Sequence, residues 1–170
     1  GVLWLFWISS LDNTIRTYLL KYKTSTDYSG EGPPKWDWQD VLHCRPQKLV
    51  EAMTEAAGIV DTQYGASFNS EPKYRERLDQ AVEMAPDKLW SRLGWMPRCP
   101  PILRDNGQTM AIGLYSDVFL CSMLAFTSDS GGSWSFSEPI RGYGVIQPCL
   151  VQRKNGDIVA FMRDKGPSKR

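Results

Sequence analysis

Runs of apolar and β-branched residues, separated by short polar turns, predict antiparallel strands at the start of the chain. Residues 3–10 are dominated by aromatic and branched side chains, and we expect an inner strand that is buried on both faces. Residues 14–25 and 36–42 predict two further strands beside it. The pattern of residues 1–42 is therefore typical of most of one antiparallel sheet.

The middle of the chain, residues 43–93, changes from two-residue alternation to helical spacing. Apolar positions within residues 46–57 recur every three or four residues, and Gly58 is expected to end that helix. A second helix is predicted after Ser70, its expected N-cap, with Pro72 in the first turn and Pro86 beyond the end. We expect a helical insertion between two β-rich parts, and a separate helical domain is the alternative.

Two-residue alternation returns at residue 94 and predicts a four-stranded antiparallel meander. Its strands are expected over residues 100–104, 109–116, 119–127 and 134–140. The Asn106-Gly107 turn recurs as Asn155-Gly156 roughly 50 residues later, an interval typical of β-propeller blades.

The predicted fold class is an all-β propeller fragment of antiparallel four-stranded blades with an α-helical insertion. Its expected parts are a partial first blade, the insertion, a complete blade and the truncated start of another blade. These parts occupy residues 1–42, 43–93, 94–143 and 144–170. Because so few blades leave sheet edges unpaired, we expect the sequence to be a fragment of a longer protein.

The turn expected after residue 127 carries a specific pattern. Its key residues fit S/T-x-D-x-G-x-x-W, the Asp box of propeller blades, and are Thr127, Asp129, Gly131 and Trp134. The carboxylate is expected to accept backbone N–H bonds of its own turn, the glycine to adopt a positive φ, and the indole to pack on the sheet. We expect a structural role for this turn. A degraded copy is predicted at residues 25–27.

Composition and charge narrow the classes of partner. The 170 residues are 42% hydrophobic and carry a net charge of +1, so the chain is globular and lacks the basic field that attracts nucleic acids. The apolar run near the N-terminus is too short to cross a bilayer. We expect no nucleic-acid partner and no membrane span. The sequence does not determine the cellular compartment, and an extracellular or periplasmic location is among the alternatives.

Cysteine and histidine usage argues against a metal site. The cysteines lack C-x-x-C spacing, and they are Cys44, Cys99, Cys121 and Cys149. Buried free thiols are the simplest interpretation, and one disulfide is the alternative. His43 is the only histidine, which excludes a mechanism with two, and we expect a structural or surface role for it. Neither a metal nor a cofactor is expected.

Several short motifs in register resemble the Asp-box sialidase-like family, also described as BNR-repeat neuraminidase-like proteins. In chain order they are WMPRCPP (95–101), GLYSD (113–117), SFSEPI (135–140), IQP (146–148) and MRDKGP (162–167). The resemblance covers residues 94–170 well, residues 2–42 weakly and the helical insertion not at all. It implies a propeller with a carbohydrate site at its central axis, where arginines bind a sugar carboxylate.

Arginines are the expected binding residues at such a site. Arg98 and Arg163 are candidates because a guanidinium can bind both oxygens of a carboxylate, and Arg170 is a weaker candidate. For Arg98 and Arg163 a structural ion pair is the alternative. The sialidase motif Phe/Tyr-Arg-Ile-Pro is incomplete in this chain. Its nearest match, residues 97–100, keeps only the arginine and the apolar or proline character after it, so the resemblance leaves the identity of the sugar acid open.

The remaining candidates lie next to the predicted strand ends. Asp117 is the candidate catalytic acid, if burial raises its pKa, and turn capping is its alternative. Tyr115 and Gln147 are expected to contact the sugar, with core packing and backbone pairing as their alternatives. Asp164 is expected to orient the neighbouring arginine for a ligand, or to pair with that arginine alone.

The predicted function is that of a sialidase-superfamily glycoside hydrolase acting on a terminal acidic or modified sugar. A polysaccharide lyase and a non-catalytic carbohydrate-binding propeller are the alternatives, and a structural interaction propeller is a third class. Hydrolysis by two carboxyl groups requires a fixed separation between them, which sequence does not supply. A carbohydrate is the expected partner.

Overall fold

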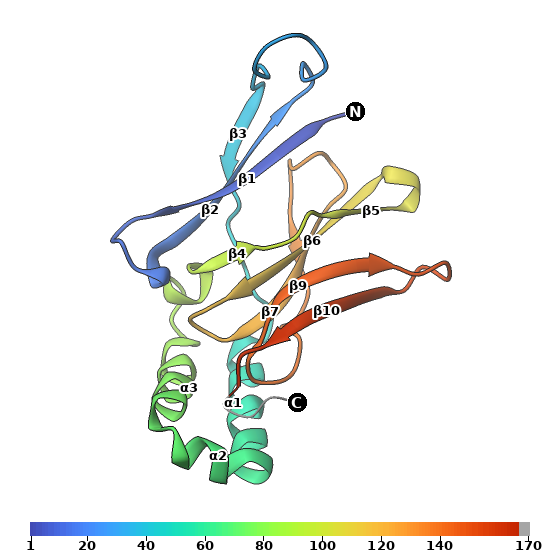
Figure 1. The fold of residues 1–170 in the computed structure, drawn as a ribbon. Coiled ribbons are helices and arrows are strands. Elements are labelled where there is room, and N and C mark those ends of the chain that lie inside the picture. The colour runs from blue at the N-terminus through green and yellow to red at the C-terminus, as the bar shows by residue number, and fades with distance from the viewer. Residues whose placement is uncertain (167–170) are drawn as a thin grey trace.

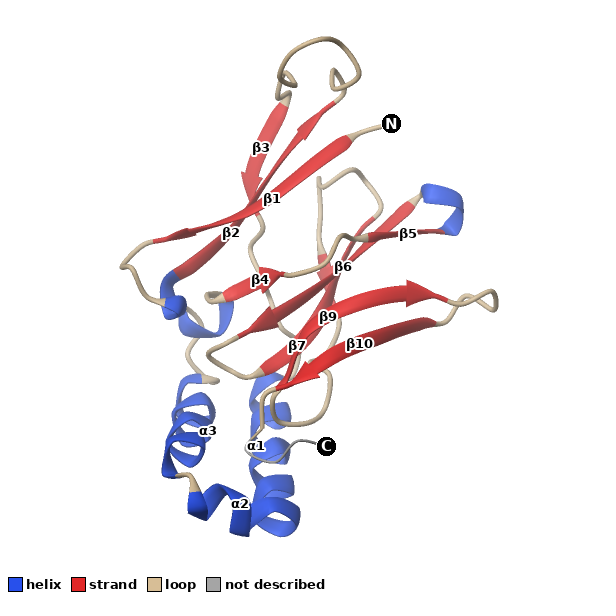
Figure 2. Ribbon diagram, in the orientation of Figure 1, coloured by secondary structure: helices blue, strands red, loops and turns tan. Residues whose placement is uncertain are grey.

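The computed structural model describes residues 1–166, which form antiparallel sheets and a helical segment (Figure 1). In chain order these are an N-terminal sheet, the helical segment, a central sheet and a C-terminal hairpin. The α-helices gather at one end of the molecule, and strands with short helical turns between them make up the rest (Figure 2). The predicted mostly antiparallel β architecture with a helical segment is confirmed, and residues 1–166 do not close into a ring.

The N-terminal sheet has the order β1 (Leu3–Ser10), β2 (Tyr18–Ser25), β3 (Trp38–Val41). The expectation that β1 is buried on both faces is wrong, since Leu5 is 43% and Ile8 37% exposed. The strand predicted to begin at residue 14 begins later, because the residues before it form a 3-10 turn, Ile15–Thr17. The Thr17 hydroxyl holds this turn by donating to the Thr14 carbonyl at 3.1 Å.

The degraded Asp box predicted at residues 25–27 is wrong, because another carboxylate, that of Asp37, holds this segment. Asp37 accepts hydrogen bonds from the Thr26 backbone N–H and hydroxyl, both at 2.7 Å. These two bonds lower the pKa of Asp37. Asp27 instead lies 3.8 Å from the Lys35 ammonium in an exposed ion pair.

The helical segment contains α1 (Leu49–Ile59), a π-helical turn (Val60–Tyr64), α2 (Gly65–Ser70) and α3 (Pro72–Met84). Gly58 does not end the first helix, which continues through it. Ser70 is not the N-cap of α3, because its hydroxyl donates to the Ser67 carbonyl at 2.9 Å and Glu71 takes the cap position. Pro72 opens α3, and α3 ends before Pro86, as the sequence predicts.

The central sheet follows a short 3-10 turn, Trp90–Arg92, and has four rows of strands. Both β4 (Trp95–Pro97) and β5 (Ile102–Arg104) pair with β6 (Thr109–Ser116), which pairs with β7 (Cys121–Thr127) and then β8 (Ser135–Phe136). Pro100 and Pro101 lie in the break between β4 and β5, because proline has no N–H for a ladder bond. The outer strand, predicted over residues 134–140, is only two residues long.

The C-terminal hairpin pairs β9 (Val145–Gln152) with β10 (Ile158–Asp164). Phe161 faces Cys149 whereas Arg163 faces Ile146, so β9 carries one extra residue in a β-bulge. Gln147 lies within this bulge and has a φ of 59°. The hairpin packs closely on the central sheet.

Aromatic rings and the Asp-box turn join the N-terminal sheet to the central sheet. The Trp134 ring meets those of Trp4, Phe6 and Tyr22 with centroids 6.3, 6.4 and 5.7 Å apart. Such aromatic pairs contribute about 0.5–1.5 kcal/mol each beyond the area that they bury. The Tyr22 hydroxyl also donates to the Gly131 carbonyl at 2.8 Å.

The Asp-box turn is held by hydrogen bonds to its carboxylate and threonine. Asp129 accepts from the Ser133 hydroxyl at 2.6 Å, the Ser133 N–H at 2.9 Å and the Thr127 hydroxyl at 2.8 Å. These bonds, with those of Ser133 the strongest, lower the pKa of Asp129 to about 2. The Gly131 N–H donates to the Thr127 hydroxyl at 2.9 Å, and Gly131 has a φ of 91°.

Candidate functional site

The two candidate arginines are exposed side chains near the contact between the central sheet and the C-terminal hairpin. Arg98 lies in the break between β4 and β5, and Arg163 lies near the end of β10. Among residues 1–166, neither guanidinium forms an ion pair or hydrogen bond. Both therefore keep their donors for solvent or a ligand. Arg170, and Pro167 of the last motif, lie outside the described residues.

A small buried cluster is formed by residues of the strands next to these arginines. Tyr115 is 5% exposed and packs with Met96, its partner across β4 and β6, and with Ile146 of β9. The structure thus places the Tyr115 ring in the core, where it cannot stack on a sugar without rearrangement. Arg163 faces Ile146 across the hairpin, and Gln147 follows Ile146 in the chain.

Contacts on the other side of the cluster bring Arg98 close to β9. Cys99, the next residue, forms a side-chain hydrogen bond with Cys149. This bond raises the pKa of the Cys99 thiol, and the nearby positive charge of Arg98 partly opposes the rise. A Cβ atom added to Gly113 of β6 would lie only 2.8 Å from Pro148 Cγ, so the strands are in close contact here. The main chain at Arg98, Gln147 and Arg163 therefore lies next to the strands that form this cluster.

Asp117, the candidate acid, lies in the β6–β7 turn and forms an ion pair. Its carboxylate accepts a hydrogen bond from Lys165 Nζ at 2.6 Å, and its side chain is 21% exposed. It does not cap the turn, because the Ser116 hydroxyl accepts from the Val118 and Phe119 N–H groups at 3.1 and 3.2 Å.

Backbone bonds fix the ends of three strands around this ion pair. The Gly144 N–H donates to the Leu120 carbonyl at 2.9 Å, and the Lys165 N–H donates to the Gly144 carbonyl at 2.9 Å. The Ser122 hydroxyl donates to the Val145 carbonyl at 2.7 Å. The Gly166 N–H donates to Asp164 at 2.7 Å, so Asp164 helps to shape the chain after β10.

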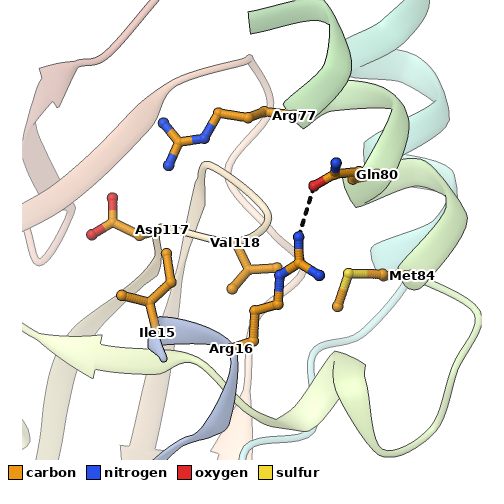
Figure 3. Close-up of a pocket in the computed structure, with 7 residues that line it drawn as sticks. All are labelled: Ile15, Arg16, Arg77, Gln80, Met84, Asp117 and Val118. Atoms are coloured by element: carbon orange, nitrogen blue, oxygen red, sulfur yellow. Dashed lines mark hydrogen bonds between the residues drawn. The ribbon is translucent and has the colours of Figure 1, made fainter. Parts of the chain in front are cut away.

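A small cavity opens beside Asp117, between the β6–β7 turn, the Ile15–Thr17 turn and α3 (Figure 3). Its volume is about 60 Å³, and its lining residues are Ile15, Arg16, Arg77, Gln80, Met84, Asp117 and Val118. Arg16 Nη2 donates to Gln80 Oε1 at 2.7 Å. The Arg77 side chain extends from α3 toward the side of the cavity where Asp117 lies.

Sequence reasoning found Asp117 but not Lys165, Arg16 or Arg77. Arg16 and Arg77 lie on segments that resemble the family weakly or not at all, and only the packing of α3 on the turns brings them to Asp117. Lys165 is part of the MRDKGP motif, but its partner is far away in the chain. No local pattern marks any of the three.

Other site classes find little support in the described part of the chain. Residues 1–166 bring together no three His, Cys, Asp or Glu side chains that are able to hold a metal ion. Within the same residues, no helix has the length and apolar character needed to cross a membrane. His43 is exposed and lines a mainly apolar cavity of about 590 Å³ away from Asp117.

Comparison with known proteins returned no family model that matches the chain, and no match among curated proteins or solved structures.

Proposed function

We propose that this chain is part of a sialidase-like β-propeller that binds an acidic sugar and hydrolyses its glycosidic bond. The observation that carries the proposal is the pair of exposed arginines, Arg98 and Arg163, which lie in the WMPRCPP and MRDKGP motifs and form no ion pair within residues 1–166. Each keeps its planar set of donors for a carboxylate ligand. The strands next to them contribute to one buried cluster.

The arrangement of the sheets supports the propeller part of the proposal. The central sheet has four antiparallel rows and an Asp-box turn between its last two strands. The N-terminal sheet packs on one side of it through Trp134, and the C-terminal hairpin packs on it through Gly113 and Pro148. Neighbouring blades of a propeller contact each other through their faces in this way.

In the proposed reaction, Arg98 and Arg163 bind the sugar carboxylate and Gln147 binds a sugar hydroxyl. Asp117, once protonated, donates its proton to the leaving glycosidic oxygen, while a water molecule adds to the anomeric carbon and releases a proton to solvent. The Asp117 carboxylate is engaged by Lys165, so this ion pair must open and the carboxyl group must take up a proton when the substrate binds. Asp164 holds the chain that follows Arg163 and thereby helps to orient that arginine.

The ion pair of Asp117 favours a second candidate function, carbohydrate binding without catalysis. A carboxylate held by an ammonium at 2.6 Å is a better hydrogen-bond acceptor for sugar hydroxyls than a proton donor. A lyase on the same fold is the third candidate, in which a base removes the proton next to the uronate carboxylate.

Binding and product measurements on the 170-residue chain test the proposal. Calorimetric titration with N-acetylneuraminic, glucuronic and galacturonic acids is expected to detect binding to at least one of them. Arg98→Ala and Arg163→Ala should each weaken it roughly tenfold or more, because each removes a charged hydrogen-bond donor from a carboxylate. Arg153→Ala, which removes an exposed arginine from the β9–β10 turn, is the control and should bind normally.

Product analysis with a glycan that ends in the bound sugar separates the candidate functions. A released reducing sugar identifies a hydrolase, an unsaturated sugar that absorbs ultraviolet light identifies a lyase, and binding without product identifies a binding module. Failure of all three acids to bind, or equal affinity of the Arg98, Arg163 and Arg153 variants, contradicts the proposal.

A further inference from the structure

We infer that the helical segment supplies a second subsite of the carbohydrate site, in a groove between α3, the Ile15–Thr17 turn and Trp90. In this groove the face of a sugar ring lies on Trp90 and its carboxylate lies between Arg16 and Arg77. The inference takes its ligand class, an acidic sugar, from the proposed function. It places the ligand contacts on residues of segments that the family resemblance covers weakly or not at all.

The groove consists of two adjoining cavities that share lining residues. The cavity of about 60 Å³ beside Asp117 shares Arg16, Gln80 and Met84 with a larger one of about 470 Å³. The larger cavity is completed by Glu83, Asp87 and Trp90. Its volume falls within the range of about 300–1,000 Å³ that is usual for small-molecule sites.

The larger cavity combines an aromatic side chain with hydrogen-bond acceptors, as a neutral sugar ring requires. Trp90 presents a partly exposed indole, on which the apolar face of a pyranose can lie. Gln80 offers an amide, while Glu83 and Asp87 offer carboxylate oxygens for hydroxyl donors. Asp87 Oδ1 accepts the Leu89 and Trp90 N–H groups at 2.8 and 2.9 Å, which fixes the position of Trp90.

The smaller cavity is the basic end of the groove. Figure 3 shows the guanidiniums of Arg16 and Arg77 on opposite sides of it. Arg16 is held in place by its bond to Gln80, and no ion pair involves Arg77 within residues 1–166. Asp117 is already neutralised by Lys165, so the two guanidiniums are the charges left to attract a ligand carboxylate.

The polar side chains around Arg77 come from several elements. Asp117 lies in the β6–β7 turn and pairs with Lys165, Arg16 lies in the Ile15–Thr17 turn, and Tyr143 lies in the loop before β9. Burial raises the pKa of Tyr143, and the nearby charge of Arg77 opposes that rise, which places the two side chains within electrostatic reach. The Tyr143 hydroxyl donates to the Tyr74 carbonyl at 3.2 Å and is therefore already paired.

Helix α3, which contributes more lining residues to the groove than any other element, is firmly anchored. Leu78 is fully buried, and Ala81 is 1% exposed, so α3 is held against α1 and the core of the sheets. The same helix presents Arg77, Gln80 and Glu83 outward. A site on a packed helix is formed before the ligand arrives, which lowers the entropy cost of binding.

The mix of charges selects one ligand class. A phosphate dianion at Arg16 would also face the carboxylates of Glu83 and Asp87, which repel a second concentrated negative charge. A sugar with a single carboxylate places its negative charge at the basic end and its hydroxyls toward the carboxylates. The groove thus fits a uronic acid residue better than a phosphorylated ligand.

Calorimetric titration of the 170-residue chain with methyl β-glucuronide tests the inference, with methyl β-glucoside and inorganic phosphate as comparison ligands. Arg77→Ala and Trp90→Ala are each expected to weaken glucuronide binding at this subsite about tenfold. Arg77→Lys keeps the charge and should give an intermediate affinity, because lysine cannot bind both carboxylate oxygens. Lys88→Ala, which removes an exposed cation outside the groove, should leave binding unchanged.

The variants also separate this inference from the proposed function. If Arg77→Ala loses one of two binding sites, and the site that remains is weakened by Arg98→Ala, the result supports both the inference and the proposed function. If Arg77→Ala loses glucuronide binding while Arg98→Ala and Arg163→Ala keep it, the result supports the subsite in the groove and contradicts the proposed site on the sheets. Wild-type affinity in Arg77→Ala and Trp90→Ala overturns the inference, as does tighter binding of glucoside or phosphate than of glucuronide.

Discussion

Gly131 illustrates how one residue in the Asp-box turn meets two separate requirements. Its φ of 91° lies in the left-handed region, and a Cβ atom there would come within 3.0 Å of Trp4 Cη2 and 3.1 Å of Tyr22 Cε2. Gly156, in the β9–β10 turn, has nearly the same φ of 92° but nothing within 4 Å of an added Cβ. The two glycines therefore separate the conformational requirement from the steric one.

We expect Gly156→Ala to lower the free energy of unfolding by about 1–2 kcal/mol, the cost of a left-handed alanine. Gly131→Ala should lower it by a further 1–3 kcal/mol or so, because the methyl group overpacks the aromatic contact between the sheets. Urea denaturation of both variants measures the difference. Equal losses would show that the contact of Gly131 with Trp4 and Tyr22 yields at little cost.

At this scale the sequence was informative where the pattern was local. It located Asp129 and Gly131, since the bonds of an Asp-box turn form within eight residues. It predicted Asp27 as the carboxylate of the N-terminal turn, because the actual acceptor, Asp37, lies 11 residues from Thr26 and outside any local pattern. The buried position of Tyr115 was one of two open alternatives, and only packing against Ile146 decided between them.

At the scale of elements, the turn between β7 and β8 depends on an ionised carboxylate. The pKa of Asp129 is about 2 in the folded chain, against an ordinary value of 3.8, because the charged form accepts bonds from Ser133 and Thr127. A folded-state pKa below the unfolded one means that the charge stabilises the fold above pH 3.8. That stabilisation is lost as the pH falls from 3.8 toward 2.

Asp129→Asn should therefore be less stable than the wild type at neutral pH, and the difference should shrink below pH 3.8. Ser133→Ala removes one donor to the carboxylate and should give a smaller loss with the same pH dependence. Denaturant titrations from pH 7 to 3 measure both differences. A stability difference that stays constant with pH would argue that the charge of Asp129 does not hold the turn.

Element boundaries were predicted well where hydrogen bonding is local and poorly where tertiary contacts compete. The ranges of β1 and β6 agree with the sequence prediction, because alternation and turn residues define them. Residues 14–17 form a 3-10 turn and not a strand, since side-chain bonds of Thr17 close the loop. The π-helical turn and α2 were missed, because Gly58 did not act as a stop.

At the scale of the whole molecule, a pair of cysteines lies where the central sheet meets the C-terminal hairpin. Cys99 and Cys149 interact through their side chains and are partly or fully exposed, whereas Cys44 and Cys121 are buried. Desolvation raises the pKa values of the two buried thiols, which makes them unreactive. A cross-link between the exposed pair would tie the two sheets together.

Oxidised glutathione is expected to convert Cys99 and Cys149 to a disulfide and to leave the buried thiols reduced. One thiolate attacks the reagent and releases a glutathione thiol, and the second thiolate then displaces the other. Mass spectrometry after alkylation should find two alkylated cysteines, and the free energy of unfolding should rise by about 2–4 kcal/mol. Alkylation of all four cysteines, or mixed disulfides alone, would contradict this arrangement.

The sequence by itself determined the local features of this protein: the antiparallel strands, two of the helices, the Asp-box turn and the candidate arginines. Each depends on periodicity or on bonds between residues close in the chain, so a short window contains the physical cause. The candidate function was likewise inferred from short motifs and remains a proposal.

Only the tertiary structure decided which side chains meet. It paired Asp117 with Lys165, brought Arg16 and Arg77 to the same cavity, and placed Cys99 beside Cys149. These contacts join residues about 50 or more positions apart, and they form because α3 and the C-terminal hairpin pack on the central sheet. Packing of that kind depends on the shapes of whole elements, which no local pattern encodes.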